Sequence, residues 1–470
     1  MTPQETASSS LLVGGDDTIV AIATPPGRGA LATIRISGPD TRRIGEALGA
    51  SVPHPRTATR VALSHPASGE PLDDAIATLF LAPRSYTGED VLELSVHGGF
   101  TVPRGVLAAC IAAGCRIALP GEFTRRAVLN GRLDLVQAEA VADLIDARTT
   151  AMGRQALAQL DGGLSRRIMA LREDLIGLEA LIAYDIDFPD EDDGPIATER
   201  ITSAAAGVLA SIDGLLATAP RAAMLRDGAL VVIAGPPNAG KSSLFNALLG
   251  DQRALVTEIP GTTRDAIEAV LDRQPVPIRL VDTAGLRDTD DPIEKLGIEV
   301  STRYLGRARI VLACGSSDAD VARTVDVITG RTDADIVGVR TKIDLGDRDD
   351  APRDVTPVAD QSLSVSRVSA ERGDGLEDLL SRLDALLAAN ESALDDEEPV
   401  LVTRERHRVA LLQARAEVEH FLEAWSGDAL PATVAAVHLH AARDVLGDVT
   451  GAILLDDVLD RVFRDFCIGK

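Results

Sequence analysis

The stretch that decides the fold of this chain is Gly235-Pro-Pro-Asn-Ala-Gly-Lys-Ser242, which directly follows the apolar run Leu230–Ala234. The run predicts a buried strand, and Leu244–Leu249 after the loop has the composition of a helix. A strand, a glycine-rich loop and a helix in this order form a phosphate-binding loop, because glycines let backbone amides and the helix N-terminus surround a phosphate. The motif therefore predicts nucleotide binding in the middle of a 470-residue chain.

The loop also supplies side chains for the phosphates and their metal. We expect Lys241 to reach the β- and γ-phosphates and Ser242 to hold Mg²⁺. The residues predicted to contact the nucleotide here are Asn238, Ala239, Gly240, Lys241, Ser242 and Ser243.

A second motif, Asp282-Thr283-Ala284-Gly285, ends the apolar run Ile278–Val281. Its aspartate is expected near Mg²⁺, and the N–H of its glycine near the γ-phosphate. A third, Thr341-Lys342-Ile343-Asp344, ends the run Ile336–Arg340. Its aspartate can accept hydrogen bonds from guanine N1–H and N2–H₂, while its lysine lies along the base.

Ser369-Ala370, after Leu363–Ser366, matches the last guanine-contacting loop. Four motifs in this order, each at the end of a strand, predict a guanine-nucleotide-binding α/β domain over residues 228–390. Thr341 departs from the usual pattern, in which an asparagine ties this loop to the phosphate-binding loop. Threonine is shorter, so we expect weaker nucleotide binding with guanine choice kept through Asp344.

The composition limits the class of protein. The length allows about three domains, and the 45% hydrophobic and 3% aromatic contents predict cores of Ala, Leu, Val and Ile. The four cysteines have no metal-ligand spacing and fit a reducing cytosol. No targeting segment or membrane-length apolar run is evident, so a soluble cytoplasmic protein is expected.

The formal net charge of −25 argues against broad nonspecific nucleic-acid binding. Any RNA contact would then need a local basic patch. Three candidates are Arg125-Arg126, Arg166-Arg167 and Arg404–Arg408, although each also reads as an ordinary solvated helix face.

The order of patterns along the chain predicts the domains. Four β-like runs and one helix predict a small α+β domain: Thr18–Thr24, Leu31–Ser37, Ala75–Phe80, Val91–His97 and the helix Val102–Ala113. Helical spacing then runs from Leu133 to Ile182 and resumes to about Ala217. After an acidic linker at Leu394–Pro399, helices are expected at 406–425, 432–445 and 453–466. The nucleotide domain is therefore predicted as an insertion in a helical domain, with boundaries 1–131, 132–227, 228–390 and 391–470.

Several stretches outside the nucleotide motifs resemble the tRNA modification GTPase MnmE family, also called TrmE. They are Ala23-Thr-Pro-Pro-Gly-Arg-Gly29, Ser85-Tyr-Thr-Gly-Glu-Asp-Val-Leu-Glu93, His97-Gly-Gly, Pro120-Gly-Glu-Phe-Thr, Leu133–Ala140 and Phe466-Cys-Ile-Gly-Lys470. The resemblance implies a folate-binding dimerisation domain, a helical domain and an inserted Ras-like G domain. It also implies GTP hydrolysis in a homodimer that forms a heterotetramer with the FAD-dependent partner MnmG (GidA). The complex would modify C5 of the wobble uridine of certain tRNAs with a tetrahydrofolate one-carbon unit.

The same resemblance assigns residues. A folate site is implied at Arg35, Glu93 and Arg132, where a carboxylate can pair with the pterin edge and guanidinium groups suit carboxylates. A potassium ion is implied in place of an arginine finger, with Asn238, Thr257, Ile259 and Thr262 as its ligands. Thr263 would join Ser242 on Mg²⁺, and Glu294 would orient the attacking water. Cys467 is a further candidate, near the folate pocket.

Two other functions fit parts of the chain. A ribosome-assembly GTPase switch would share the G domain but should bring a basic RNA-binding module. A folate-binding scaffold with a vestigial G domain would not need the intact Lys241, Ser242, Asp282 and Glu294. Mass analysis of wobble uridines in cells lacking the protein separates these readings.

Overall fold

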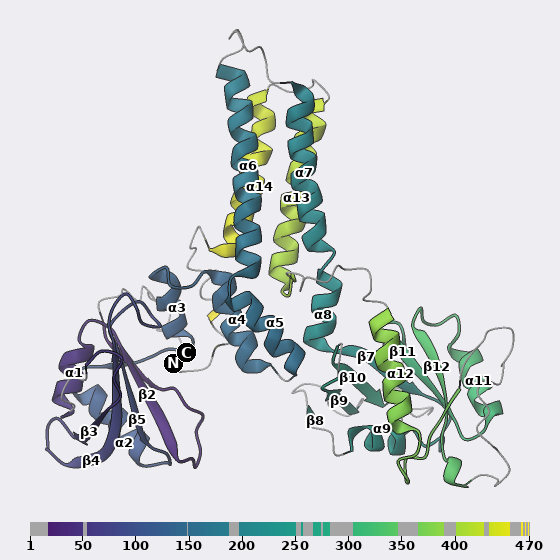
Figure 1. The fold of residues 1–470 in the computed structure, drawn as a ribbon, viewed down its shortest axis with the longest axis horizontal. Coiled ribbons are helices and arrows are strands. Elements are labelled where there is room, and N and C mark those ends of the chain that lie inside the picture. Colours follow the sequence, from purple (N-terminus) through teal and green to yellow (C-terminus); the bar gives the residue numbers. More distant parts are fainter. Residues whose placement is uncertain are drawn as a thin grey trace, which may run out of the picture. The chain divides into compact units, whose positions relative to one another are not determined.

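The computed structural model describes residues 17–49, 54–147, 149–187, 197–250, 255–256, 267–273, 276–282, 304–345, 365–389, 401–426, 432–451, 462–463, 466 and 469 (Figure 1). The chain divides into two compact units. One comprises Met1–Ala142, Gln159–Ala197 and His420–Lys470, and the other Asp143–Ala158 and Thr198–Glu419.

The first unit begins with a six-stranded sheet of order β3-β4-β5-β2-β1-β6. Its strands are β1 Ile19–Ile22, β2 Leu31–Ser37, β3 Thr59–Ser64, β4 Pro71–Phe80, β5 Val91–His97 and β6 Arg116–Ile117. The accompanying helices are α1 Thr41–Ala47, α2 Val102–Ala112 and α3 Glu122–Leu129. Strand β2 alternates as a half-buried strand should, with Ala32, Ile34 and Ile36 in the core and Arg35 on the opposite face.

Long helices complete this unit. They include α6 Gly163–Asp187, α14 Ala432–Thr450 and the part of α4 Leu135–Asp146 that precedes residue 143. Helices α6 and α14 pack side by side (Figure 1). The buried residues of α6 recur every three or four positions, which gives one apolar face toward its neighbours: Leu164, Ile168, Leu171, Leu175, Leu178 and Ile182.

The predicted helical pattern from residue 133 to 182 is not continuous. Helix α5 covers Thr150–Leu160, and α6 begins only at Gly163. Gly162 between them has φ +84°, a conformation that glycine adopts without the penalty a side chain brings. The break therefore has a local cause that apolar spacing alone does not reveal.

The second unit contains a seven-stranded sheet of order β13-β12-β11-β7-β10-β9-β8. The strands are β7 Ala229–Ala234, β8 Leu255–Val256, β9 Ile267–Leu271, β10 Ile278–Asp282, β11 Ile310–Gly315, β12 Asp335–Arg340 and β13 Val365–Arg367. All neighbours are parallel except the β8–β9 and β9–β10 pairs. Strands β7 and β11 are buried along nearly their whole length, as central parallel strands covered by helices should be.

The helices of this unit are α7 Thr198–Leu216, α8 Ala219–Asp227, α9 Lys241–Leu249, α11 Asp318–Ile328, the short 3₁₀ helix η2 Ile343–Leu345 and α12 Leu376–Ala389. Helix α13, Glu405–Ser426, follows them.

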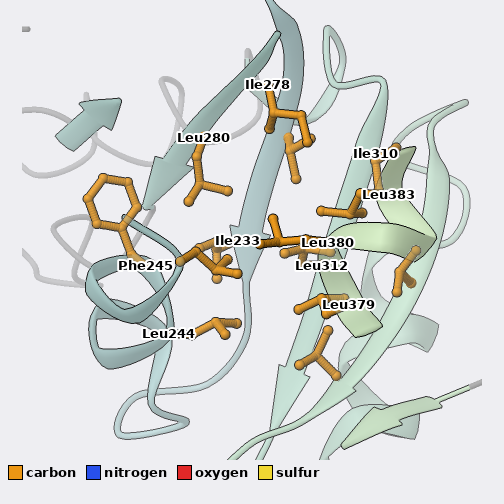
Figure 2. Close-up of a cluster of buried hydrophobic side chains, with 14 of the residues drawn as sticks. Ile233, Leu244, Phe245, Ile278, Leu280, Ile310, Leu312, Leu379, Leu380 and Leu383 are labelled. Carbon is orange, nitrogen blue, oxygen red and sulfur yellow. The ribbon is translucent and has the colours of Figure 1, made fainter. Parts of the chain in front are cut away.

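Figure 2 shows how α9 and α12 cover the sheet. Leu244 and Phe245 of α9 and Leu380 of α12 join Ile233 and Leu312 of the central strands in one buried cluster. Burying a side chain of this size contributes about 1.5–3 kcal/mol. This packing fixes α9, and with it the loop that precedes it.

One segment, Thr198–Asp227, is long and apolar enough to cross a membrane, contrary to the expectation that no run approaches that length. One third of its most apolar window is buried. Within it, α7 buries Ile201, Ala205 and Val208 at helical spacing, which is the pattern of a core helix that packs through one face.

The sequence located most strands and helices of the sheets well. Leu31–Ser37, Val91–His97 and Ile278–Asp282 match β2, β5 and β10. It missed the strands β3, β6, β8, β9 and β11 and the helices α1, α3, α8, α11 and α12. The predicted helix 453–466 falls mostly outside the described residues.

Candidate functional site

The loop between β7 and α9 has backbone conformations that fit its residues. A Cβ on Gly235 would lie 2.4 Å from the Cys314 carbonyl oxygen, so only glycine fits there. Gly240 has φ +79° and forms the N-cap of α9. Asn238 has φ +62°, a region that asparagine enters more readily than most residues. The loop thus places the N-terminus of α9 next to the carboxyl end of β7.

Lys241 is folded into this loop. Its Nζ donates to the carbonyl oxygens of Gly235 and Pro236, each at 2.9 Å. Burial lowers the pKa of Lys241, while the nearby Asp282 carboxylate acts in the opposite direction. Asp282 is itself only 3% exposed and ends β10, paired in register with Ile233 of β7. The ammonium of the first residue of α9 therefore lies within electrostatic range of the carboxylate that ends β10.

Thr341 links the loop after β12 to the phosphate-binding loop through its hydroxyl, while the weaker nucleotide binding expected of it stays a prediction. Its Oγ1 lies 2.6 Å from the Ala239 carbonyl oxygen and 3.2 Å from that of Gly315. A hydroxyl has one proton, and the shorter contact shows that it is donated to Ala239. Gly240 packs closely against this side chain: a Cβ there would lie 3.3 Å from the Thr341 hydroxyl oxygen, a tight contact.

Asp344, which follows β12, and Ser369, which follows β13, are hydrogen-bonded to each other. The Ser369 hydroxyl donates to Asp344 Oδ1 at 2.8 Å, and Ser369 is fully buried. The backbone N–H of Arg372 in turn donates to the Ser369 hydroxyl at 3.2 Å. One carboxylate oxygen is thus held by the protein. Lys342, with φ +58°, lies close to the phosphate-binding loop, its Cε 3.6 Å from a Cβ placed on Gly240.

The structure brings together the described members of the predicted nucleotide site. Lys241 and Asp282 interact, Thr341 contacts Ala239, and Asp344 contacts Ser369. Ser242 and Ser243 are exposed in the first turn of α9. The other predicted residues lie outside the described part of the chain: Thr257, Ile259, Thr262, Thr263, Thr283, Ala284, Gly285, Glu294 and, at the C-terminus, Cys467.

In the N-terminal domain, the predicted folate residues Arg35 and Glu93 are cross-strand neighbours on β2 and β5. Arg35 donates from Nε to Glu93 Oε1 at 2.9 Å, and its second contact with that oxygen is 2.8 Å. Its remaining nitrogen lies 3.3 Å from the Gly469 carbonyl oxygen. Both side chains keep some exposure, 16% for Arg35 and 29% for Glu93, so a ligand can still reach them.

Aromatic rings complete the surroundings of Arg35, and the sequence did not single them out. The guanidinium carbon lies 5.2 Å from the centre of the Tyr86 ring and 5.7 Å from that of Phe123. Arg132 donates to the carbonyl of Ser85, the residue before Tyr86, at 3.2 Å. Tyr86 could have been suspected from the sequence, because it lies in the same stretch, Ser85–Glu93, as the predicted folate residue Glu93.

The basic pairs proposed for RNA contact have acidic partners within the chain. Arg126 is only 4% exposed and donates to Glu89 at 3.1 Å and to the Asp17 carbonyl at 2.8 Å, so it is a structural residue. Arg166 pairs with the Asp161 carboxylate at 3.3 Å. In the third candidate, Arg408 donates to Glu405 at 2.7 Å.

Known proteins match nearly the whole chain. The profile of the MnmE helical domain matches residues 135–467, and that of the GTP-binding protein TrmE N-terminus matches residues 18–132. The tRNA modification GTPase MnmE of Heliobacterium modesticaldum is 40% identical over 469 residues, covering 97% of this chain and 99% of the relative. That of Bordetella petrii is 42% identical over 460 residues, covering 96% and 98%.

Solved structures resemble part of the chain. The G domain of the Thermotoga maritima iron transporter FeoB is 24% identical and matches with a TM-score of 0.26, covering 34% of this chain and 98% of that one. A structure of Era bound to MgGDPNP and 16S ribosomal RNA is 22% identical, with a TM-score of 0.27, covering 40% and 66%.

The helical profile begins before the nucleotide domain and ends after it, while a separate profile covers the N-terminal domain. The predicted fold class is confirmed: an α+β N-terminal domain, then a helical domain that carries an inserted Ras-like α/β domain. The boundaries at residues 131, 227 and 390 stay predictions.

Proposed function

Since the chain belongs to the tRNA modification GTPase MnmE family, we propose that it hydrolyses GTP in order to modify C5 of the wobble uridine of certain tRNAs. The group added is carboxymethylaminomethyl or aminomethyl, and its one-carbon unit comes from a tetrahydrofolate derivative. The chain acts as a homodimer, joined in a heterotetramer by the FAD-dependent partner MnmG (GidA).

The observation that carries the guanine preference is the Asp344 carboxylate with Ser369 on one of its oxygens. The other oxygen is available to the guanine edge, where N1–H and N2–H₂ donate. Adenine lacks both donors, so binding it would leave the second oxygen of this half-buried carboxylate without a partner, and that cost discriminates against ATP. Lys342 and Ala370 line the same base-binding loop.

The phosphates would be held at the N-terminus of α9. Phosphate oxygens can replace the Gly235 and Pro236 carbonyls as partners of Lys241, because the ammonium is already aimed at the centre of the loop. The exposed Ser242 hydroxyl and the buried Asp282 carboxylate are oxygen groups of the kind that Mg²⁺ prefers, with Thr263 as the further protein ligand. Mg²⁺ supplies charge neutralisation at the β- and γ-phosphates.

For hydrolysis we propose a potassium ion in place of an arginine finger. The exposed Asn238, held at positive φ, can present its amide oxygen to such an ion. Thr257, Ile259 and Thr262 would complete the oxygen ligands, and Glu294 would orient the attacking water.

In the N-terminal domain, the residues present fit a reduced folate. The Glu93 carboxylate suits the donor edge of a pterin, while Arg35 and Arg132 suit the carboxylates of its tail. Tyr86 and Phe123 give Arg35 an apolar backing that holds its guanidinium in place. We keep Cys467 as a further candidate residue for folate chemistry, on the family resemblance of the terminal stretch alone.

We propose a cytoplasmic location, free of the membrane, in keeping with a tRNA substrate. The apolar segment Thr198–Asp227 is then accounted for by the buried face of α7. With a net charge of −25, tRNA is expected to reach the complex mainly through the partner.

The test combines nucleotide choice with tRNA chemistry. Asp344→Asn should relax the preference for GTP over ATP, whereas Asp378→Asn, an equal charge change on the exposed face of α12, should not. Cells lacking the protein should lose the wobble-uridine modification by mass analysis and regain it with the wild-type chain. If Asp344→Asn prefers GTP over ATP as strongly as the wild type does, the assignment of the base site is refuted. If the deletion strain keeps the wobble-uridine modification, the proposed tRNA chemistry is refuted.

A further inference from the structure

Two histidines from different helices face each other, and neither belongs to the proposed nucleotide or folate sites. His420 lies on α13 and His438 on α14. Their ring centres are 5.4 Å apart, with the ring planes tilted by 55°. Ring nitrogens of the two side chains lie within 4.8 Å of one another. Both rings can be reached from solvent, because His420 is exposed and His438 half-buried.

The backbone under these histidines is fixed by packing. The next residue on α13, Phe421, and the next on α14, Leu439, are both fully buried. Each histidine therefore sits at the margin of a buried helix face, where its Cα is held while its ring can turn. This combination favours a binding site, because the helices set the separation and the rings adjust to the ligand.

The separation suits a transition-metal ion. Imidazole nitrogen binds Zn²⁺ at about 2.0–2.1 Å, so two nitrogens in a tetrahedral site lie roughly 3.4 Å apart. Closing from the present separation requires a movement of about 1–1.5 Å, which rotation of two surface rings supplies. Imidazole also suits Cu²⁺ and Ni²⁺, whereas Mg²⁺ and Ca²⁺ prefer oxygen ligands.

Helix α13 offers a carboxylate at matching spacing. Glu417 precedes His420 by three residues, and residues three apart lie on one face of a helix. Glu-x-x-His on a helix is a recurrent way to present one carboxylate and one imidazole to the same ion.

The third nearby histidine has a different surrounding. His440 is two residues beyond His438, so it points to another side of α14. Its Nδ1 lies 3.0 Å from the Ala436 carbonyl oxygen and 3.7 Å from Glu179, whose other oxygen binds Arg443 at 2.9 Å. A guanidinium so close makes this second location unfavourable for a cation.

We propose that His420 and His438 chelate a divalent first-row transition-metal ion, with Glu417 of α13 as a further ligand. The ion joins α13 to α14 and stabilises their pairing, in the way that a ligand bound only by the folded state stabilises that state. The site is independent of the proposed GTP and folate chemistry, since none of its residues belongs to those sites.

Zinc binding by the full-length protein tests the proposal. Protein freed of metal by a chelator and then saturated with Mg²⁺ and GDP is titrated with ZnCl₂ in a calorimeter. The wild-type chain should bind Zn²⁺ in the micromolar range, and His420→Gln and His438→Gln should each weaken that binding at least about tenfold. His440→Gln is the matched control and should bind as the wild type does.

Cobalt gives a second readout. Co²⁺ bound by the wild-type chain should show visible absorption bands that both site variants lose and the control keeps. Circular dichroism checks that each variant is folded, which the surface positions of both rings favour. The proposal is overturned if the wild-type chain has no Zn²⁺ site tighter than about 1 mM, or if both site variants bind as tightly as the wild type. In either case the two rings merely pack against each other.

Discussion

Replacing Thr341 with valine isolates the hydroxyl that links the base-binding loop to the phosphate-binding loop. Valine keeps the shape of threonine and removes only the proton donated to the Ala239 carbonyl across 2.6 Å. The Gly315 carbonyl keeps a partner, because the backbone N–H of Thr341 still donates to it at 2.9 Å. The loss is thus one buried hydrogen bond in a residue only 3% exposed, worth about 1–2 kcal/mol.

Since this bond orders the loop that receives the phosphates, the same energy should appear in nucleotide affinity. We expect GDP to bind about 5- to 30-fold more weakly to Thr341→Val, with faster dissociation. Fluorescent GDP in a stopped-flow instrument measures both rates, and urea unfolding without nucleotide measures the stability change. Thr341→Ser keeps the hydroxyl and should stay near the wild type. Equal GDP dissociation rates for the valine variant, the serine variant and the wild type would refute the linking role.

Three further predictions concern the proposed chemistry. GTP hydrolysis should be faster in potassium than in sodium buffer at matched ionic strength, and equal rates would exclude the potassium site. Glu294→Ala should bind GTP nearly as the wild type does but hydrolyse it about 10²-fold more slowly; an unchanged single-turnover rate would make this residue a surface charge. Arg35→Ala and Glu93→Ala should each weaken binding of 5-formyl-tetrahydrofolate in a calorimetric titration, and unchanged affinity in both would remove the folate site from these residues.

The parts of the fold that depend on local pattern could be predicted from the sequence. Strand β10 and the phosphate-binding loop are marked by an apolar run that ends at residues with special chemistry, Asp282 and Gly235. Helix α6 is marked by regular apolar spacing. The break before it was missed, because a single glycine at 162 decides it and the apolar residues continue on both sides.

The site was harder to predict where partners are distant in sequence. The type of side chain at position 341 predicted weaker nucleotide binding, because threonine is shorter than asparagine, but it did not reveal what the hydroxyl contacts. Its actual partner, Ala239, is 102 residues away in the sequence. Likewise, Arg35 and Glu93 were identified singly, whereas their direct pairing follows from the register of β2 against β5. Such contacts depend on how distant parts of the chain come together in the fold, and local sequence patterns give no information about that.

The chain enters and leaves the nucleotide domain at neighbouring backbone positions. The N–H of Val402 donates to the Thr218 hydroxyl at 3.1 Å, across 184 residues of chain. Arg226, at the end of α8, donates to the Thr403 carbonyl at 2.7 Å. The chain segment that enters the nucleotide domain and the segment that leaves it are therefore hydrogen-bonded to each other. The nucleotide domain is in this sense a long loop whose two ends are held together. The entropic free energy of closing a loop rises only slowly with the length of the loop. A helical protein could therefore acquire a whole domain between two neighbouring backbone positions, or exchange that domain for another, at little cost in stability.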